Sequence, residues 1–174
     1  MNIQGYGSGS FVDIMNSSHK RNQIPLVNQI VSYKDTEDGR AIGVTAVGNI
    51  GYVARYADSS TPENPVIKIG DYEVLVNEVD PHNATQLEMF ALLSYFDDTN
   101  QTNNTGMSSF SKLRSFAEIA EMNGLCEDIK DVNSFYNKTQ NWEEIMCAIK
   151  KVFLGNPQTY EQALNCDKLI DILG

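Results

Sequence analysis

One short stretch holds the residue types best suited to acid–base chemistry in this chain. Asp80, His82 and Asn83 lie there together, and Glu88 follows a few positions later. A carboxylate beside an imidazole fixes the ring tautomer and supports proton transfer, as in general acid–base catalysis. Asp and Asn also accept hydrogen bonds from the free backbone N–H groups at the start of a helix. We therefore interpret Asp80, His82 and Asn83 as polar candidates for a site, and as a helix start in the simpler alternative.

Catalysis by these residues would need a nucleophile or a metal from elsewhere in the chain. A small hydrolase with a pocket near residues 80–83 and 97–106, and with Cys126 as a partner, is one alternative. The sequence contains no G-x-S-x-G elbow and no recognisable cysteine-protease context. The two histidines, His19 and His82, are far apart, and no C-x-x-C or H-x-x-x-H spacing suits zinc. We predict no catalytic residue set, no metal site and no cofactor.

Composition narrows the classes of function further. The 174 residues include 13 Lys and Arg against 23 Asp and Glu, for a formal net charge of −10. Because nucleic-acid binding relies on cationic side chains, we expect no nucleic-acid partner. No apolar run approaches the roughly 20 residues of a membrane span, so we expect a soluble protein without a membrane partner. Three cysteines without short spacings indicate free thiols and a cytoplasmic location.

The elements that must position the candidates begin with strand-like patterns. Residues 26–34 and 40–57 are rich in β-branched and aromatic side chains. Further along, two apolar runs flank Gly70-Asp71, a pair typical of a two-residue hairpin turn. The alternation along this hairpin predicts one face formed by Val66, Lys68, Tyr72 and Val74. We expect an N-terminal antiparallel sheet of four or five strands over residues 26–79, approximately.

Helical patterns follow the strands. The predicted helices cover approximately residues 84–97, 108–123, 142–154 and 159–173, and a short turn of helix fits residues 127–136. Capping boxes are predicted where these helices begin, at Asn83 with Gln86, Asn141 with Glu144, and Thr159 with Gln162. Strands followed by helices, without alternation, indicate an α+β fold. We expect a single α+β domain over residues 24–174, preceded by a flexible Gly-, Ser- and Asn-rich arm at residues 1–23.

Two longer segments carry a family resemblance. SYKDTEDGRAI and VNEVDPHNATQLEMFALLSYFDD, over roughly residues 32–97, resemble a family of small uncharacterised proteins from anaerobic Gram-positive bacteria. The resemblance implies a bacterial source. It implies no activity and no catalytic residues.

These observations favour a non-catalytic protein-interaction or assembly module. Apolar side chains on a flexible segment can dock into a groove of a protein partner or of a second copy of the chain. The predicted docking residues of the N-terminal arm are Phe11, Val12, Ile14 and Met15. Besides the small hydrolase, a second alternative is an acidic inhibitor or immunity-type protein that binds a basic partner.

Overall fold

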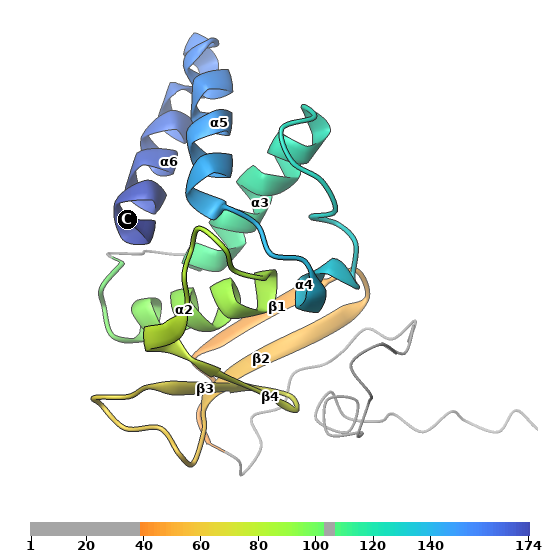
Figure 1. The fold of residues 1–174 in the computed structure, drawn as a ribbon. Helices are drawn as coiled ribbons and strands as arrows, with labels where there is room; N and C mark the ends of the chain where they lie inside the picture. The colour runs from red at the N-terminus through yellow and green to blue at the C-terminus, as the bar shows by residue number, and fades with distance from the viewer. Residues whose placement is uncertain (1–38, 103–106) are drawn as a thin grey trace, which may run out of the picture.

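The structure is a computed structural model, and it describes residues 39–102 and 107–174. Within these ranges an antiparallel sheet is followed by helices, so the predicted α+β fold with an N-terminal sheet is confirmed (Figure 1). The predicted arm at residues 1–23 and the predicted strand at 26–34 lie outside the described residues. So do the predicted docking residues Phe11, Val12, Ile14 and Met15.

The strands of the described residues form one four-stranded antiparallel sheet in the order β1-β2-β3-β4. They are β1 (Gly43–Val47), β2 (Ile50–Tyr56), β3 (Val66–Ile69) and β4 (Tyr72–Leu75). Gly70 has a φ of 60°, a left-handed conformation that glycine adopts without a steric penalty. The two-residue turn predicted at Gly70-Asp71 is therefore confirmed.

The faces of the β3–β4 hairpin differ from the predicted alternation. Ile69 lies opposite Tyr72, and Ile67 lies opposite Val74. Residues directly opposite each other in an antiparallel pair point to the same face of the sheet. Tyr72 and Val74 therefore share a face with the two isoleucines, and the predicted grouping with Lys68 is wrong. The reason is that a two-residue turn pairs odd-numbered positions of one strand with even-numbered positions of the other.

The four long helices match the predicted ranges within two residues at each end, whereas the short turn predicted at 127–136 begins only at Ser134. The helices of the described residues are α2 (Gln86–Asp98), α3 (Ser109–Met122), the short α4 (Ser134–Asn137), α5 (Trp142–Leu154) and α6 (Tyr160–Leu173). Two 3₁₀ turns, η1 (Val76–Glu78) and η2 (Pro157–Thr159), precede α2 and α6. In Figure 1, α2 lies between the sheet and the other long helices, and the α5–α6 hairpin projects away from the sheet.

Helix α2 connects the two layers of the fold. Its buried apolar side chains are Leu87, Met89, Phe90, Ala91, Leu92 and Leu93. Such a helix, apolar around most of its circumference, is typical of an element covered on several sides. The Phe90 ring packs on Phe110 of α3 with 5.1 Å between centroids. On the sheet side, a Cβ at Gly43 would lie 2.1 Å from Ser94 Oγ, so glycine at this position lets β1 approach α2 closely.

The start of α2 is later than predicted. Thr85 is the N-cap: its Oγ1 accepts a hydrogen bond from Glu88 N at 3.2 Å, and Glu88 Oε2 accepts one from Thr85 N at 2.7 Å. The predicted box of Asn83 with Gln86 is wrong. Ala84 pairs with Gln140 in an antiparallel bridge, so the chain is still extended at this point and the helix begins after it.

The other two predicted capping boxes have different outcomes. At the start of α5, Asn141 Oδ1 accepts a hydrogen bond from Glu144 N at 3.0 Å, so Asn141 is the predicted cap. Thr159 is the residue that precedes the first turn of α6, as predicted, but it forms no capping box, because its Oγ1 donates to the Phe153 carbonyl at 2.8 Å. The η2 turn, which begins at Pro157, continues directly into α6.

Hydrogen bonds join the segment before α2 to the segment before α5. Ala84 and Gln140 exchange two backbone hydrogen bonds, with N···O distances of 3.2 and 2.9 Å. Trp142 is fully buried beside them. Its Nε1 donates to the Ala84 carbonyl at 2.8 Å, and its backbone N donates to the Pro81 carbonyl at 2.9 Å. These contacts hold residues 80–83 against the first turn of α5.

Candidate functional site

His82 lies between two carboxylates. Its Nδ1 is 3.1 Å from Asp80 Oδ1, and its Nε2 is 2.6 Å from Glu143 Oε2. The same Asp80 oxygen accepts a hydrogen bond from the His82 backbone N at 2.9 Å. Glu143 comes within reach because Trp142, its neighbour in the chain, is bonded to Pro81. With both ring nitrogens facing carboxylates, the geometry suits a doubly protonated imidazolium, which donates from both nitrogens.

The electrostatics of this cluster agree with its geometry. The hydrogen bond to Asp80, followed by the one to Glu143, raises the pKa of His82 above its usual value. The hydrogen bond from the His82 backbone N–H, followed by the one from its ring, lowers the pKa of Asp80. The His82 side chain is 52% exposed and that of Asp80 is 63% exposed. The arrangement is therefore a surface ion-pair cluster that links the chain before α2 to α5.

The structure brings together only part of the predicted set. Asn83 is exposed, and its backbone N donates to the Asp80 carbonyl at 2.9 Å. Glu88 is occupied by its box with Thr85. Sequence reasoning missed Glu143, which lies 61 residues from His82. The sequence predicts that Glu143 lies in the first turn of α5, because it follows the cap at Asn141. No local pattern predicts that its carboxylate contacts His82.

Cys126 has a hydrogen-bond partner of its own in α3. Its Sγ donates to the Ala117 carbonyl at 3.4 Å, and burial is the main cause that raises its pKa to about 11. Burial likewise raises the pKa of Cys166 to about 12. Because the thiolate is the reactive form of cysteine, neither thiol is suited to attack a substrate at neutral pH. Within residues 39–102 and 107–174, no group of three or more His, Cys, Asp or Glu side chains could hold a metal ion.

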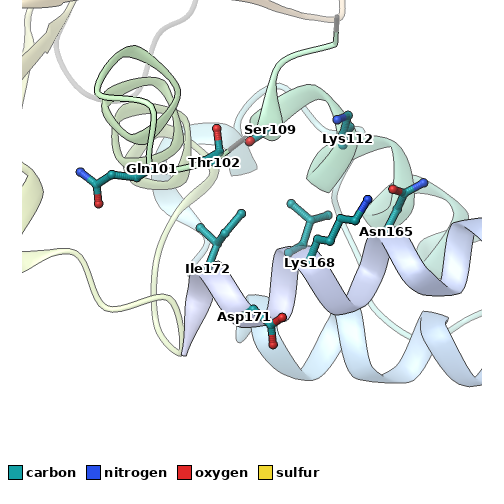
Figure 2. Close-up of a pocket in the computed structure, with 9 residues that line it drawn as sticks. Gln101, Thr102, Ser109, Lys112, Asn165, Lys168, Asp171 and Ile172 are labelled. Atoms are coloured by element: carbon teal, nitrogen blue, oxygen red, sulfur yellow. The ribbon is translucent and has the colours of Figure 1, made fainter. Parts of the chain in front are cut away.

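A pocket of about 380 Å³ lies between the start of α3, helix α6 and residues 101–102 (Figure 2). Its polar lining consists of Gln101, Thr102, Ser109, Lys112, Asn165, Lys168 and Asp171. None of residues 80–83 lines this pocket, although the hydrolase hypothesis placed a pocket beside them. From the other segment of that hypothesis, residues 97–106, Gln101 and Thr102 line the pocket.

Asp97 fixes the wall of this pocket where α2 ends and α3 begins. Its Oδ2 accepts a hydrogen bond from Ser109 N at 2.8 Å, and its Oδ1 accepts one from Ser109 Oγ at 2.7 Å. The Thr102 hydroxyl also donates to Asp97. A carboxylate at the first turn of α3 is stabilised by the positive end of the helix dipole. Asp97 thereby holds the hydroxyl side of the pocket in a defined position.

Comparisons with known proteins place this chain beside no relative. No protein-family model matches it, and no curated protein and no solved structure matches it either. The resemblance over residues 32–97 stays a prediction. In the part of the chain that the structure describes, no helix is both long enough and apolar enough to cross a membrane.

Proposed function

We propose that this protein acts in the cytoplasm as a non-catalytic protein-interaction or assembly module. The observation that supports the proposal is a group of large apolar side chains near the end of the α5–α6 hairpin. They are between 40% and 56% exposed and comprise Val152, Leu154, Tyr160 and Leu164, which we call the hairpin tip. Figure 1 shows this end of the hairpin as the part of the fold that projects farthest from the sheet.

The hairpin tip combines apolar exposure with a fixed scaffold. Each Å² of apolar surface removed from water contributes roughly 25 cal/mol, so burial of these side chains on a partner would be favourable. The hairpin is held by an ion pair between Lys150 and Asp167 and by the bond from Thr159 to the Phe153 carbonyl. A surface that is already ordered loses little conformational entropy on binding. The geometry thus supports docking by this end of the molecule.

Local charge also permits contact at the hairpin tip. The whole chain carries a net charge of −10. Around the tip, however, Lys150 and Lys151 accompany Glu161 and Asp167, so the negative charge is not concentrated there. Self-association through the tip would therefore meet less electrostatic repulsion than the total charge suggests.

The test uses charge substitutions at the hairpin tip. Leu154→Glu and Leu164→Glu together should abolish self-association measured by light scattering, or the capture of a defined partner identified in a pull-down with purified protein. Met122→Glu is the matched control, because Met122 is 74% exposed on α3 and lies outside the tip. Circular dichroism checks that each variant is folded. Assembly and capture that survive the double substitution would contradict the proposal, as would a wild-type protein that neither assembles nor captures a partner.

The two alternatives predict different behaviour in the same assays. An acidic inhibitor or immunity-type protein would bind a basic partner with an affinity that falls steeply with salt. Contact through the apolar tip would depend much less on salt. A small hydrolase would lose its activity in the His82→Gln variant, whereas an interaction module would keep its partner in that variant.

A further inference from the structure

We propose that the partner of the hairpin tip is a second copy of this chain, related to the first by a two-fold axis that runs along the α5–α6 hairpin. In this arrangement α5 of each copy packs on α6 of the other. Lys151 of one copy faces Glu161 of the other copy, and this contact occurs twice. The inference rests on the proposed interaction function and names the partner of that same surface.

Three of the four apolar side chains of the hairpin tip lie on one side of the hairpin. On α5, Leu154 follows Lys150 at i+4, and on α6, Leu164 and Asp167 follow Tyr160 at i+4 and i+7. Residues at these spacings share one face of a helix. The two faces meet because Lys150 and Asp167 form an ion pair across the hairpin. Leu154, Tyr160 and Leu164 are therefore exposed on the same side.

One positive and one negative charge border this apolar surface. Lys151 belongs to the last turn of α5, and Glu161 belongs to the first turn of α6. Both residues are exposed, and neither forms an ion pair within residues 39–102 and 107–174. Opposite charges thus lie on different helices at the same end of the hairpin, where each is available to a charge of another molecule.

A two-fold axis along the hairpin brings these opposite charges together. An interface with two-fold symmetry is self-complementary, because each contact is repeated with the roles of the two copies exchanged. Rotation about this axis places α5 against α6 of the other copy and keeps both tips at the same end. Lys151 and Glu161 both lie in the helix turn next to the connection at residues 155–159, so they meet at a similar level. An axis across the hairpin would instead pair each helix with its own counterpart and bring like charges together.

The acidity of the chain favours contact through the part that projects farthest. Two copies with a net charge of −10 each repel one another. This repulsion falls off over about 8 Å at physiological ionic strength, so it weakens when only the tips approach closely. Figure 1 shows that the tip lies away from the sheet and α2. The apolar side chains then contribute affinity, and the Lys151–Glu161 contacts select the orientation.

The experiment measures the mass of the full-length chain by analytical ultracentrifugation over a range of concentrations. We expect a reversible dimer. Lys151→Glu and Glu161→Lys should each weaken the dimer by about fivefold or more, because each brings like charges together at both contacts. The double variant with both substitutions should recover the affinity of the wild type to within about twofold, because the same contacts form again with exchanged charges.

Two controls separate this pairing from other effects of charge. Glu161→Lys reduces the net negative charge of the chain, so general repulsion between copies predicts a stronger dimer where the pairing predicts a weaker one. Lys130→Glu is the matched control for Lys151→Glu, since Lys130 is an exposed lysine outside the hairpin, and it should leave the affinity almost unchanged. Circular dichroism checks the fold of each variant. The double variant keeps both charges at unfavourable helix ends, so its recovery cannot come from more stable helices.

Three results would each overturn the inference. They are a wild-type chain that stays monomeric at the highest concentration measured, a single variant that dimerises as well as the wild type, and a double variant that does not recover. A monomeric chain whose tip still captures a defined partner would overturn this inference and leave the proposed interaction function standing. The two failures are therefore distinguishable.

Discussion

His82 shows how a residue suited to catalysis can serve a structural purpose. Its ring nitrogens lie 3.1 Å from Asp80 and 2.6 Å from Glu143, and all three side chains belong to segments that begin helices or precede them. A charged imidazole in this position connects α5 to the chain before α2. Both carboxylates stabilise the charged form of the ring.

The raised pKa of His82 gives a prediction at this scale. In the Glu143→Gln variant, the pKa of His82 should fall toward its ordinary value, because one of the two carboxylates that stabilise the imidazolium is removed. Glu144→Gln is the matched control, because it removes the same charge from the next position of the same helix turn. In this variant the pKa of His82 should stay higher than in Glu143→Gln. An NMR titration of the His82 ring measures both variants.

The stability effect of this cluster has a defined sign. A pKa raised by folding contributes stability that is fully present below the unfolded value, about 6.5. That contribution is lost as the pH rises through the higher folded-state pKa of His82. The lowered pKa of Asp80 acts in the opposite sense, since its contribution is lost as the pH falls through the folded-state value. Equal titration of His82 in the wild type and in Glu143→Gln would contradict the assigned contact.

Among the elements, α2 shows most clearly which features a sequence predicts. Its existence and its buried character follow from a dense apolar run. Its first residue does not, because Asn83 and Thr85 both have the chemistry of a cap and both are followed by Gln or Glu at the third position. The helix begins after Thr85 because Gln140 pairs with Ala84 and keeps the chain extended there. Long-range pairing of this kind leaves no local pattern.

The two candidate caps can be separated by substitution. Thr85→Ala should lower the free energy of unfolding by about 1 kcal/mol, the usual loss when a helix N-cap is removed. Asn83→Ala is the matched control and should have little effect, because Asn83 is exposed and its side chain is not the cap. Urea denaturation followed by circular dichroism measures both. A larger loss in Asn83→Ala than in Thr85→Ala would contradict the observed cap.

Other elements were predictable where their signals are local. Helix α5 begins and ends as predicted, since Asn141 caps its start and Gly155 follows its last residue. The hairpin turn at Gly70 was predictable for the same reason, although the faces of its strands were not. The pocket was not predictable, because Lys112 and Lys168 belong to different helices and only their packing brings them to one cavity.

For the whole molecule, Trp142 is a reporter of the packing between its parts. It is the only tryptophan in the chain. It is fully buried, and it bonds to carbonyls that precede α2 while it begins α5. Its surroundings therefore exist only when the N-terminal and C-terminal parts of the described chain are both folded and in contact.

We expect one cooperative transition on unfolding. In urea, the red shift of Trp142 fluorescence and the loss of helical circular dichroism should have the same midpoint, as in a two-state transition. Free N-acetyltryptophanamide in the same urea solutions serves as the control for solvent effects on emission. A fluorescence change complete at a urea concentration where the helical signal is still intact would show that the two parts separate before they unfold.

The hydrogen bond from Trp142 to Ala84 spans 58 residues, which has a consequence for synthesis in the cell. A ribosome releases the sheet and α2 first, at a time when the residues that pair with Ala84 are still being made. Until they emerge, the carbonyl of Ala84 lacks its partner, and the site of the indole ring is empty. The early part of the chain thus leaves the exit tunnel without its final contacts. We expect its last folding step to follow translation of α5.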